Sequence, residues 1–173
     1  MLLEPESLFQ ANRRQCRKIK LKTIISNEKS VLAEKISNAV NFHGHLGPFL
    51  VIGVRMGVIG MRELKLRSND GKLLVTAHLK YSIPISCVLD GLQVITRCTT
   101  GNQKLRLIDS SNIAAKFTLN NGKEVTVEVD FAVYNKLKSQ LLSENNSPKE
   151  VEHLAHLIAS MPEEDLFIIR RNF

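Results

Sequence analysis

The sequence has no tryptophan and only three cysteines among its 173 residues. An odd number of cysteines does not form a complete disulfide framework, and free thiols are typical of a reducing compartment. At this length a chain can bury enough apolar surface to fold without disulfides. Hydrophobic residues make up 43% and charged residues 24%, which is ordinary for a globular protein.

Long apolar runs are also absent. The longest, residues 49–59, contains Arg55 and is shorter than the roughly 20 residues that a membrane-spanning helix needs. The N-terminal Met1-Leu2-Leu3 is followed at once by Glu4, which argues against a secretory signal. These absences predict a cytoplasmic protein with no membrane partner.

Acidic residues are in the minority, and the formal charge is +7. Six of the basic residues lie within ten positions: Arg13, Arg14, Arg17, Lys18, Lys20 and Lys22. We interpret residues 1–25 as a basic arm with a solvated face, dispensable for the core. Nucleic-acid binding is the less favoured alternative, because no DNA- or RNA-reading motif accompanies the run.

The remaining chain, residues 26–173, is predicted to form one α+β domain. Helices are predicted near 28–40, 48–64, 84–97, 131–142 and 149–161, and strands at 73–81, 105–108, 114–119, 125–129 and 166–170. Asn121-Gly122 indicates a hairpin. Because consecutive strands are joined by this hairpin and the helices are grouped elsewhere, we expect a mixed or antiparallel sheet packed against helices. Gly53, Gly57 and Gly60 predict a closely packed helix face.

The most distinctive local feature is His43-Gly44-His45. Two imidazoles one residue apart point to the same side of an extended backbone, and imidazole is a good ligand for zinc and related metals. The alternative is a pair of loop histidines bonded to backbone carbonyls. Gly47 and Pro48 then open a helix, whose N-terminus is a candidate binding site for a small anionic ligand.

A second candidate segment contains Cys87 and Asp90, three residues apart and therefore on one face of a helix. A thiolate and a carboxylate could complete a histidine-rich site. The competing interpretation is that Cys87 is a small core residue. The familiar P-loop, GxGxxG, GxSxG and HExxH motifs do not occur, so no catalytic residue is assigned.

Both segments together resemble the signatures of the FmdE/FwdE-like family of formylmethanofuran dehydrogenase proteins. The first signature covers residues 42–48 (Phe-His-Gly-His-Leu-Gly-Pro), followed by Gly53 and residues 55–57. The second covers residues 86–93 and 96–102. Two signatures in order, about forty residues apart, are more specific than either alone. The resemblance covers roughly residues 28–135.

The resemblance implies an FwdE/GAPDH-C-terminal-domain-like α+β fold, a homodimer, and a site for zinc or a similar divalent transition metal. It implies ligand roles for His43, His45 and Cys87, with Asp90 and Cys98 near the site. The expected function is that of a metal-binding accessory or small-molecule-binding domain, with a larger oxidoreductase complex as a possible assembly. The alternative is a metal-dependent enzyme of unknown reaction with an open zinc site.

Three departures from the family pattern bear on these expectations. Many members have cysteine where this chain has Gly47, which predicts weaker or lost metal binding. Glycine is usual where this chain has Arg97. Longer members carry a C-terminal zinc ribbon with a Cys-x-x-Cys motif, and this sequence has no such motif.

Overall fold

The computed structural model describes residues 29–67, 71–141 and 147–173. A helix covers residues 29–43. The later elements are α2 (Pro48–Glu63), β1 (Leu73–His78), α3 (Cys87–Thr96), β2 (Leu105–Ile108), β3 (Ala114–Leu119), β4 (Glu124–Val129), α4 (Phe131–Leu141), α5 (Pro148–Ser160), α6 (Glu163–Leu166) and β5 (Phe167–Asn172). The sheet and the candidate site belong to the unit Ile36–Phe173.

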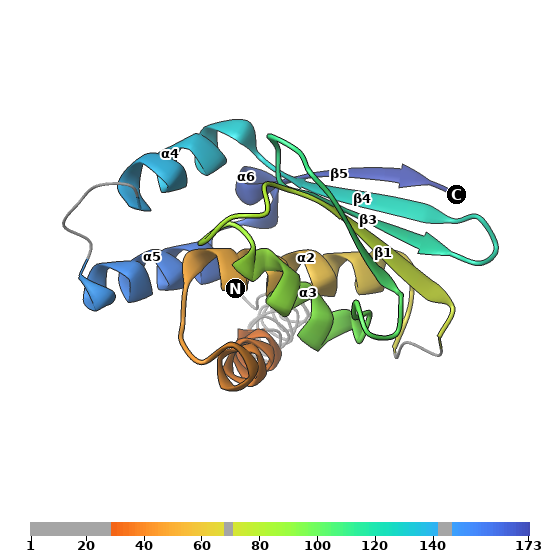
Figure 1. Cartoon of the computed structure of the whole chain (residues 1–173), viewed down its shortest axis with the longest axis horizontal. Coiled ribbons are helices and arrows are strands. Elements are labelled where there is room, and N and C mark those ends of the chain that lie inside the picture. Colours follow the sequence, from red (N-terminus) through yellow and green to blue (C-terminus); the bar gives the residue numbers. More distant parts are fainter. Residues whose placement is uncertain (1–28, 68–70, 142–146) are drawn as a thin grey trace, which may run out of the picture. The chain divides into compact units, whose positions relative to one another are not determined.

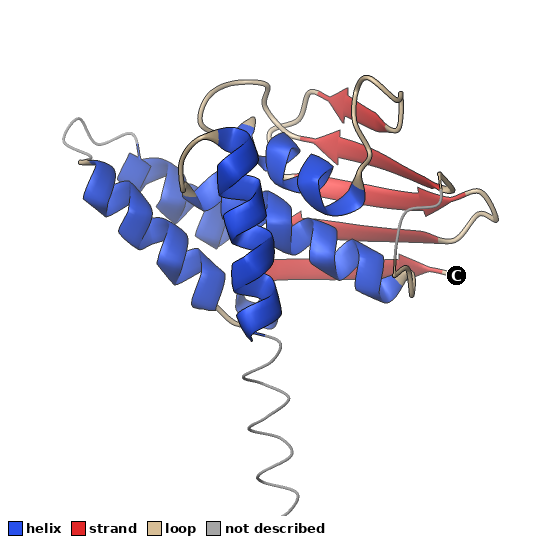
Figure 2. Ribbon diagram, turned by 90° about the horizontal axis from the view of Figure 1, so that it is seen from below, coloured by secondary structure: helices blue, strands red, loops and turns tan. Residues whose placement is uncertain are grey.

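The five strands form one sheet in the order β2-β1-β3-β4-β5. β1 pairs in parallel with β2, whereas the other neighbours are antiparallel. Figure 1 shows α2 running along one face of this sheet, and Figure 2 shows the helical layer in front of the strands. The predicted α+β class with a mixed sheet is therefore confirmed.

Alternating side chains place the core on the helix-facing side of the sheet. Leu73, Val75 and Ala77 of β1 are fully buried, as are Ala115 and Phe117 of β3. The intervening residues of both strands are partly exposed. This period of two is the burial pattern expected of a sheet covered on one side.

Glycines allow α2 and α3 to cross with their backbones almost in contact. A Cβ added to Gly53 would lie 2.1 Å from the carbonyl oxygen of Val88, and one on Gly91 would lie 2.5 Å from that of Leu50. Likewise, a Cβ on Gly60 would meet the Phe117 ring at 2.6 Å. The predicted close packing of the α2 glycines is confirmed, and it fixes α3 against α2.

Several predicted boundaries change. The third helix begins at Cys87 and not at Pro84, because residues 82–86 first form tight turns, including Ser86 N–H to Ser82 C=O at 2.9 Å. It ends at Thr96, where Arg97 takes a left-handed conformation (φ 56°). Tyr81, expected on the buried face of β1, is 72% exposed because it lies beyond the strand.

The C-terminal prediction missed one element. The short helix α6 occupies Glu163–Leu166 and delays the last strand until Phe167. The basic arm, the start of the first helix and Asn69-Asp70 lie outside the described residues. Among the residues that are described, no helix is both long enough and apolar enough to cross a membrane.

Candidate functional site

The two signature segments meet at His43 and Asp90. His43 ends the helix over residues 29–43, and Asp90 lies in the first turn of α3. His43 Nδ1 lies 2.7 Å from Asp90 Oδ2, with 12% of the histidine side chain and 32% of the aspartate side chain exposed. This hydrogen bond joins residues 47 positions apart and closes the site.

The His43 and His45 rings lie side by side, although the backbone between them is not extended. Gly44 has φ 98° and donates its N–H to the Val40 carbonyl at 2.7 Å, which ends the helix. The ring centroids are 4.5 Å apart and the ring planes are tilted by 39°. The prediction that both imidazoles share one side holds, but the reason is a helix end with a glycine of positive φ.

His43 has a buried ring nitrogen without a partner. Its Nε2 is inaccessible to solvent and has no hydrogen-bond partner among the described residues. Buried polar atoms are almost always satisfied, so an orphaned nitrogen requires an explanation. Since Nδ1 is already engaged by Asp90, Nε2 is the atom of His43 that remains for a ligand.

Gly47 lies beside the second histidine. A Cβ added at Gly47 would be 3.7 Å from His45 Nε2, an ordinary van der Waals distance, and no other residue comes within 4 Å of that position. Gly47 is the N-cap of α2, has an extended backbone (φ −143°) and gives no side-chain cap, while Pro48 occupies the first turn. The backbone would therefore accept another residue at position 47.

Cys87 is half-buried at the start of α3. Burial raises the pKa of its thiol, and the nearby Asp90 carboxylate raises it further. The second Asp90 oxygen, Oδ1, accepts a hydrogen bond from Gln93 Nε2 at 3.2 Å. Sequence reasoning missed Gln93, although its three-residue spacing from Asp90 on a helix is the signal for such a contact.

Cys98 lies away from these groups. It is fully buried beyond the opposite end of α3, and its thiol donates a 3.4 Å hydrogen bond to the Leu73 carbonyl. A ten-residue helix is about 15 Å long, so the length of α3 separates Cys98 from Cys87. Across residues 29–67, 71–141 and 147–173, no group of three or more His, Cys, Asp or Glu side chains is arranged to hold a metal ion.

Comparison with known families explains why these segments meet. The family model described as "FmdE, Molybdenum formylmethanofuran dehydrogenase operon" matches residues 42–168, well over half of the chain. The chain belongs to the FmdE family. The match begins next to His43 and contains α2, α3 and the whole sheet, so the His43–Asp90 contact lies within the family domain.

Two similar proteins place the domain in context. The first is a crystal structure of an FmdE-like protein of tungsten formylmethanofuran dehydrogenase, from Syntrophus aciditrophicus. It has a TM-score of 0.54 and 19% identity, covering 82% of this chain and 71% of the other. The second is a probable S-adenosyl-L-methionine-binding protein of Archaeoglobus fulgidus, 37% identical over 84 residues. That match covers 49% of this chain but only 23% of the relative's length.

Proposed function

We propose that this FmdE-like domain is a metal-binding accessory or small-molecule-binding domain that holds zinc or a similar divalent ion. His43 and His45 would supply imidazole nitrogens, and Cys87 would supply a thiolate. The observation that carries the proposal is the buried, unpartnered Nε2 of His43, whose other ring nitrogen is bonded to Asp90.

The Asp90 contact orients His43 in the way that metal sites commonly require. A ligating histidine usually gives its second ring N–H to a carboxylate, which fixes the tautomer and the ring orientation. If His43 donates from Nδ1 to Asp90, then Nε2 carries a lone pair and no proton. An acceptor nitrogen that is already desolvated suits a cation better than it suits solvent.

The donor types also fit zinc, for which imidazole nitrogens and thiolates are common ligands. The described side chains do not gather three donors at one point, so the two histidines come first and Cys87 takes the third position. The raised pKa of Cys87 means that its thiol is protonated at neutral pH without a cation. Metal binding would therefore release a proton.

Elemental analysis of the purified full chain tests this proposal. We expect a divalent ion in the protein and its loss from a His43→Ala/Cys87→Ser double variant. Asp90→Asn should weaken metal affinity by roughly 10- to 100-fold because it disturbs the orientation of His43. His156→Ala, on the exposed face of α5, is the matched control. Near-stoichiometric metal in the double variant would overturn this ligand set.

Gly47→Cys provides a gain-of-function test. The extended backbone and the 3.7 Å gap to His45 Nε2 leave room for a side chain there, and the new thiol would add a soft ligand. We expect tighter zinc binding than in the original chain, measured by competition with a chelator. Gly47→Ser fills similar space without a thiol, so equal tightening by both variants would contradict a coordination effect.

A metal-dependent enzyme with an open site is the alternative function. It would need an acid or base free to act on the substrate. Both Asp90 oxygens are engaged, by His43 and by Gln93, and this supports a positioning role for Asp90 over a catalytic one. Metal-dependent turnover that Asp90→Asn abolishes while metal content stays normal would favour the enzyme.

S-adenosyl-L-methionine is a second candidate ligand, favoured only by the name of the Archaeoglobus fulgidus relative. Because the match covers 23% of that protein, its ligand could be bound elsewhere. Equilibrium dialysis with the purified full chain tests this candidate. Binding that persists in His43→Ala would separate this ligand from the metal site, and no binding at millimolar concentration would remove the candidate.

The resemblance also implies a homodimer, and we include dimerisation, cytoplasmic location and docking to a larger oxidoreductase complex in the proposal. Exposed apolar side chains flank both signatures: Phe42 is 61%, Tyr81 72% and Ile83 88% exposed. Side chains of this type are enriched where proteins associate. Sedimentation velocity at micromolar concentration should show a dimer, and a monomer alone would count against it.

A further inference from the structure

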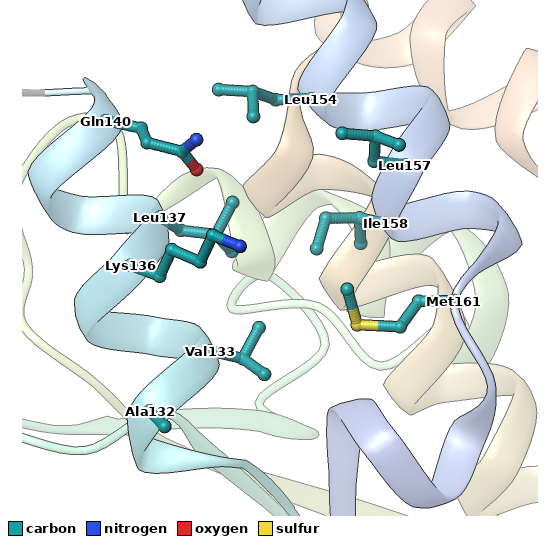
Figure 3. Close-up of a pocket in the computed structure, with 9 residues that line it drawn as sticks. All are labelled: Ala132, Val133, Lys136, Leu137, Gln140, Leu154, Leu157, Ile158 and Met161. Carbon is teal, nitrogen blue, oxygen red and sulfur yellow. The ribbon is translucent and has the colours of Figure 1, made fainter.

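An apolar groove separates α4 from α5, on elements that carry none of the site residues above. Figure 3 shows side chains from both helices projecting toward the space between them. The groove encloses about 270 Å³. Val133 and Leu137 line the α4 wall, and Leu154, Leu157 and Ile158 line the α5 wall.

The groove exists because the two helices are anchored to different parts of the core. α5 packs along α2, with Leu154 and Ile158 buried. α4 is anchored through buried Tyr134 and Leu137, and its backbone approaches other described elements only sparsely. Leu157 lines the groove yet remains 47% exposed, which leaves apolar surface available to a ligand.

One cationic side chain stands at this apolar site. Lys136 lies on the α4 wall and extends toward the groove in Figure 3. Among the described residues its ammonium group forms none of the ion pairs found in the structure. A lysine beside an apolar cavity combines a surface for a hydrocarbon chain with a charge for an anion.

We propose that this groove binds a small amphipathic anion, namely a short alkyl chain ending in a carboxylate. The chain would lie against Leu137, Leu157 and Ile158, and the carboxylate would pair with Lys136. Apolar burial would supply most of the affinity, and the ion pair would set the direction in which the chain lies.

The size of the groove favours a small molecule over a partner helix. Ligand pockets are usually about 300–1,000 Å³, so this cavity suits a molecule below drug size. A docked amphipathic helix inserts several anchor side chains along a longer groove. A helix would also place polar backbone ends and further side chains beyond the apolar walls.

The test uses octanoate, with 1-octanol as the uncharged probe of the same chain length. Binding to the full chain is followed by NMR titration and by calorimetry. Lys136→Gln should weaken octanoate binding by roughly three- to tenfold, since an exposed ion pair contributes modestly, while octanol binding stays the same. Lys138→Gln, on the same helix but outside the groove, is the matched control.

Val133→Phe supplies an independent check because it fills the groove from the α4 wall. It should reduce the binding of both probes while the protein stays folded. Failure of the full chain to bind either probe at millimolar concentration would overturn the proposal. So would octanoate binding that is indifferent to both variants, or a self-association that Leu157→Glu disrupts and octanoate does not affect.

Discussion

The α2–α3 crossing and the α4–α5 pair are two helix packings with opposite use of space. At the crossing, glycines remove side chains so that the backbones nearly touch. In the α4–α5 pair, leucine and valine side chains face a groove of about 270 Å³. The crossing brings Asp90 to His43 and so requires a fixed geometry, whereas the groove leaves room for a ligand. Tightness therefore accompanies the site that positions atoms, and looseness the site proposed to admit a chain.

The strongest way to break the tight region is Gly53→Ala. The new Cβ would lie 2.1 Å from the Val88 carbonyl oxygen, which is backbone and has no rotamer to change. We expect a loss of about 3 kcal/mol or more in unfolding free energy, measured by urea denaturation. Gly101→Ala is the control, because its Cβ would meet nothing closer than 3.8 Å. Equal effects of the two substitutions would contradict a steric cause.

Arg55 links the two regions, and its removal should have the next largest effect. Its buried guanidinium, on α2, donates to the carbonyls of Ile158 and Met161 at the end of α5, at 2.6 and 2.7 Å. Burial lowers the pKa of Arg55, and Glu163 partly opposes this shift. Because two charged hydrogen bonds would be lost, Arg55→Met should cost about 3 kcal/mol.

Arg55→Lys provides the control for that prediction. Lysine keeps the charge but cannot present the planar fork that reaches two carbonyls together. We expect it to recover only part of the loss in the same urea experiment. Full recovery would mean that charge, and not the paired hydrogen bonds, holds α5 to α2.

Leu154 and Leu157 compare the two sides of the groove within one helix. Leu154 is 8% exposed and Leu157 is 47% exposed. Leu154→Ala should cost about 2–3 kcal/mol because it opens a cavity in the core. Leu157→Ala should cost about 1 kcal/mol or less, since little apolar burial is lost. Thermal unfolding without ligand measures both, and equal losses would show that the groove is closed in solution.

The sequence predicted these two regions unequally. Strand alternation, the Asn121-Gly122 hairpin and the α2 glycines are local signals, and the structure confirms what they predict. The meeting of His43 and Asp90 depends on the α2–α3 crossing, which local periodicity does not encode, and the family resemblance only placed Asp90 near the site. The α4–α5 groove was not foreseen because each helix taken alone has an ordinary amphipathic pattern. It is the distance between them that creates the groove.

Arg97→Gly should give the smallest effect and the opposite sign, because it relieves strain at the end of the tightly packed α3. Arg97 has φ 56° and ψ 16°, and its N–H donates to the Gln93 carbonyl at 2.8 Å. A side chain in this left-handed region costs roughly 1–2 kcal/mol, while glycine adds conformational entropy to the unfolded chain. The balance predicts a gain of about 0.5 kcal/mol in urea unfolding. Arg97→Ala keeps the Cβ, so it should give no gain. Stabilisation by both variants would assign the effect to loss of the arginine charge, and not to relief of the backbone.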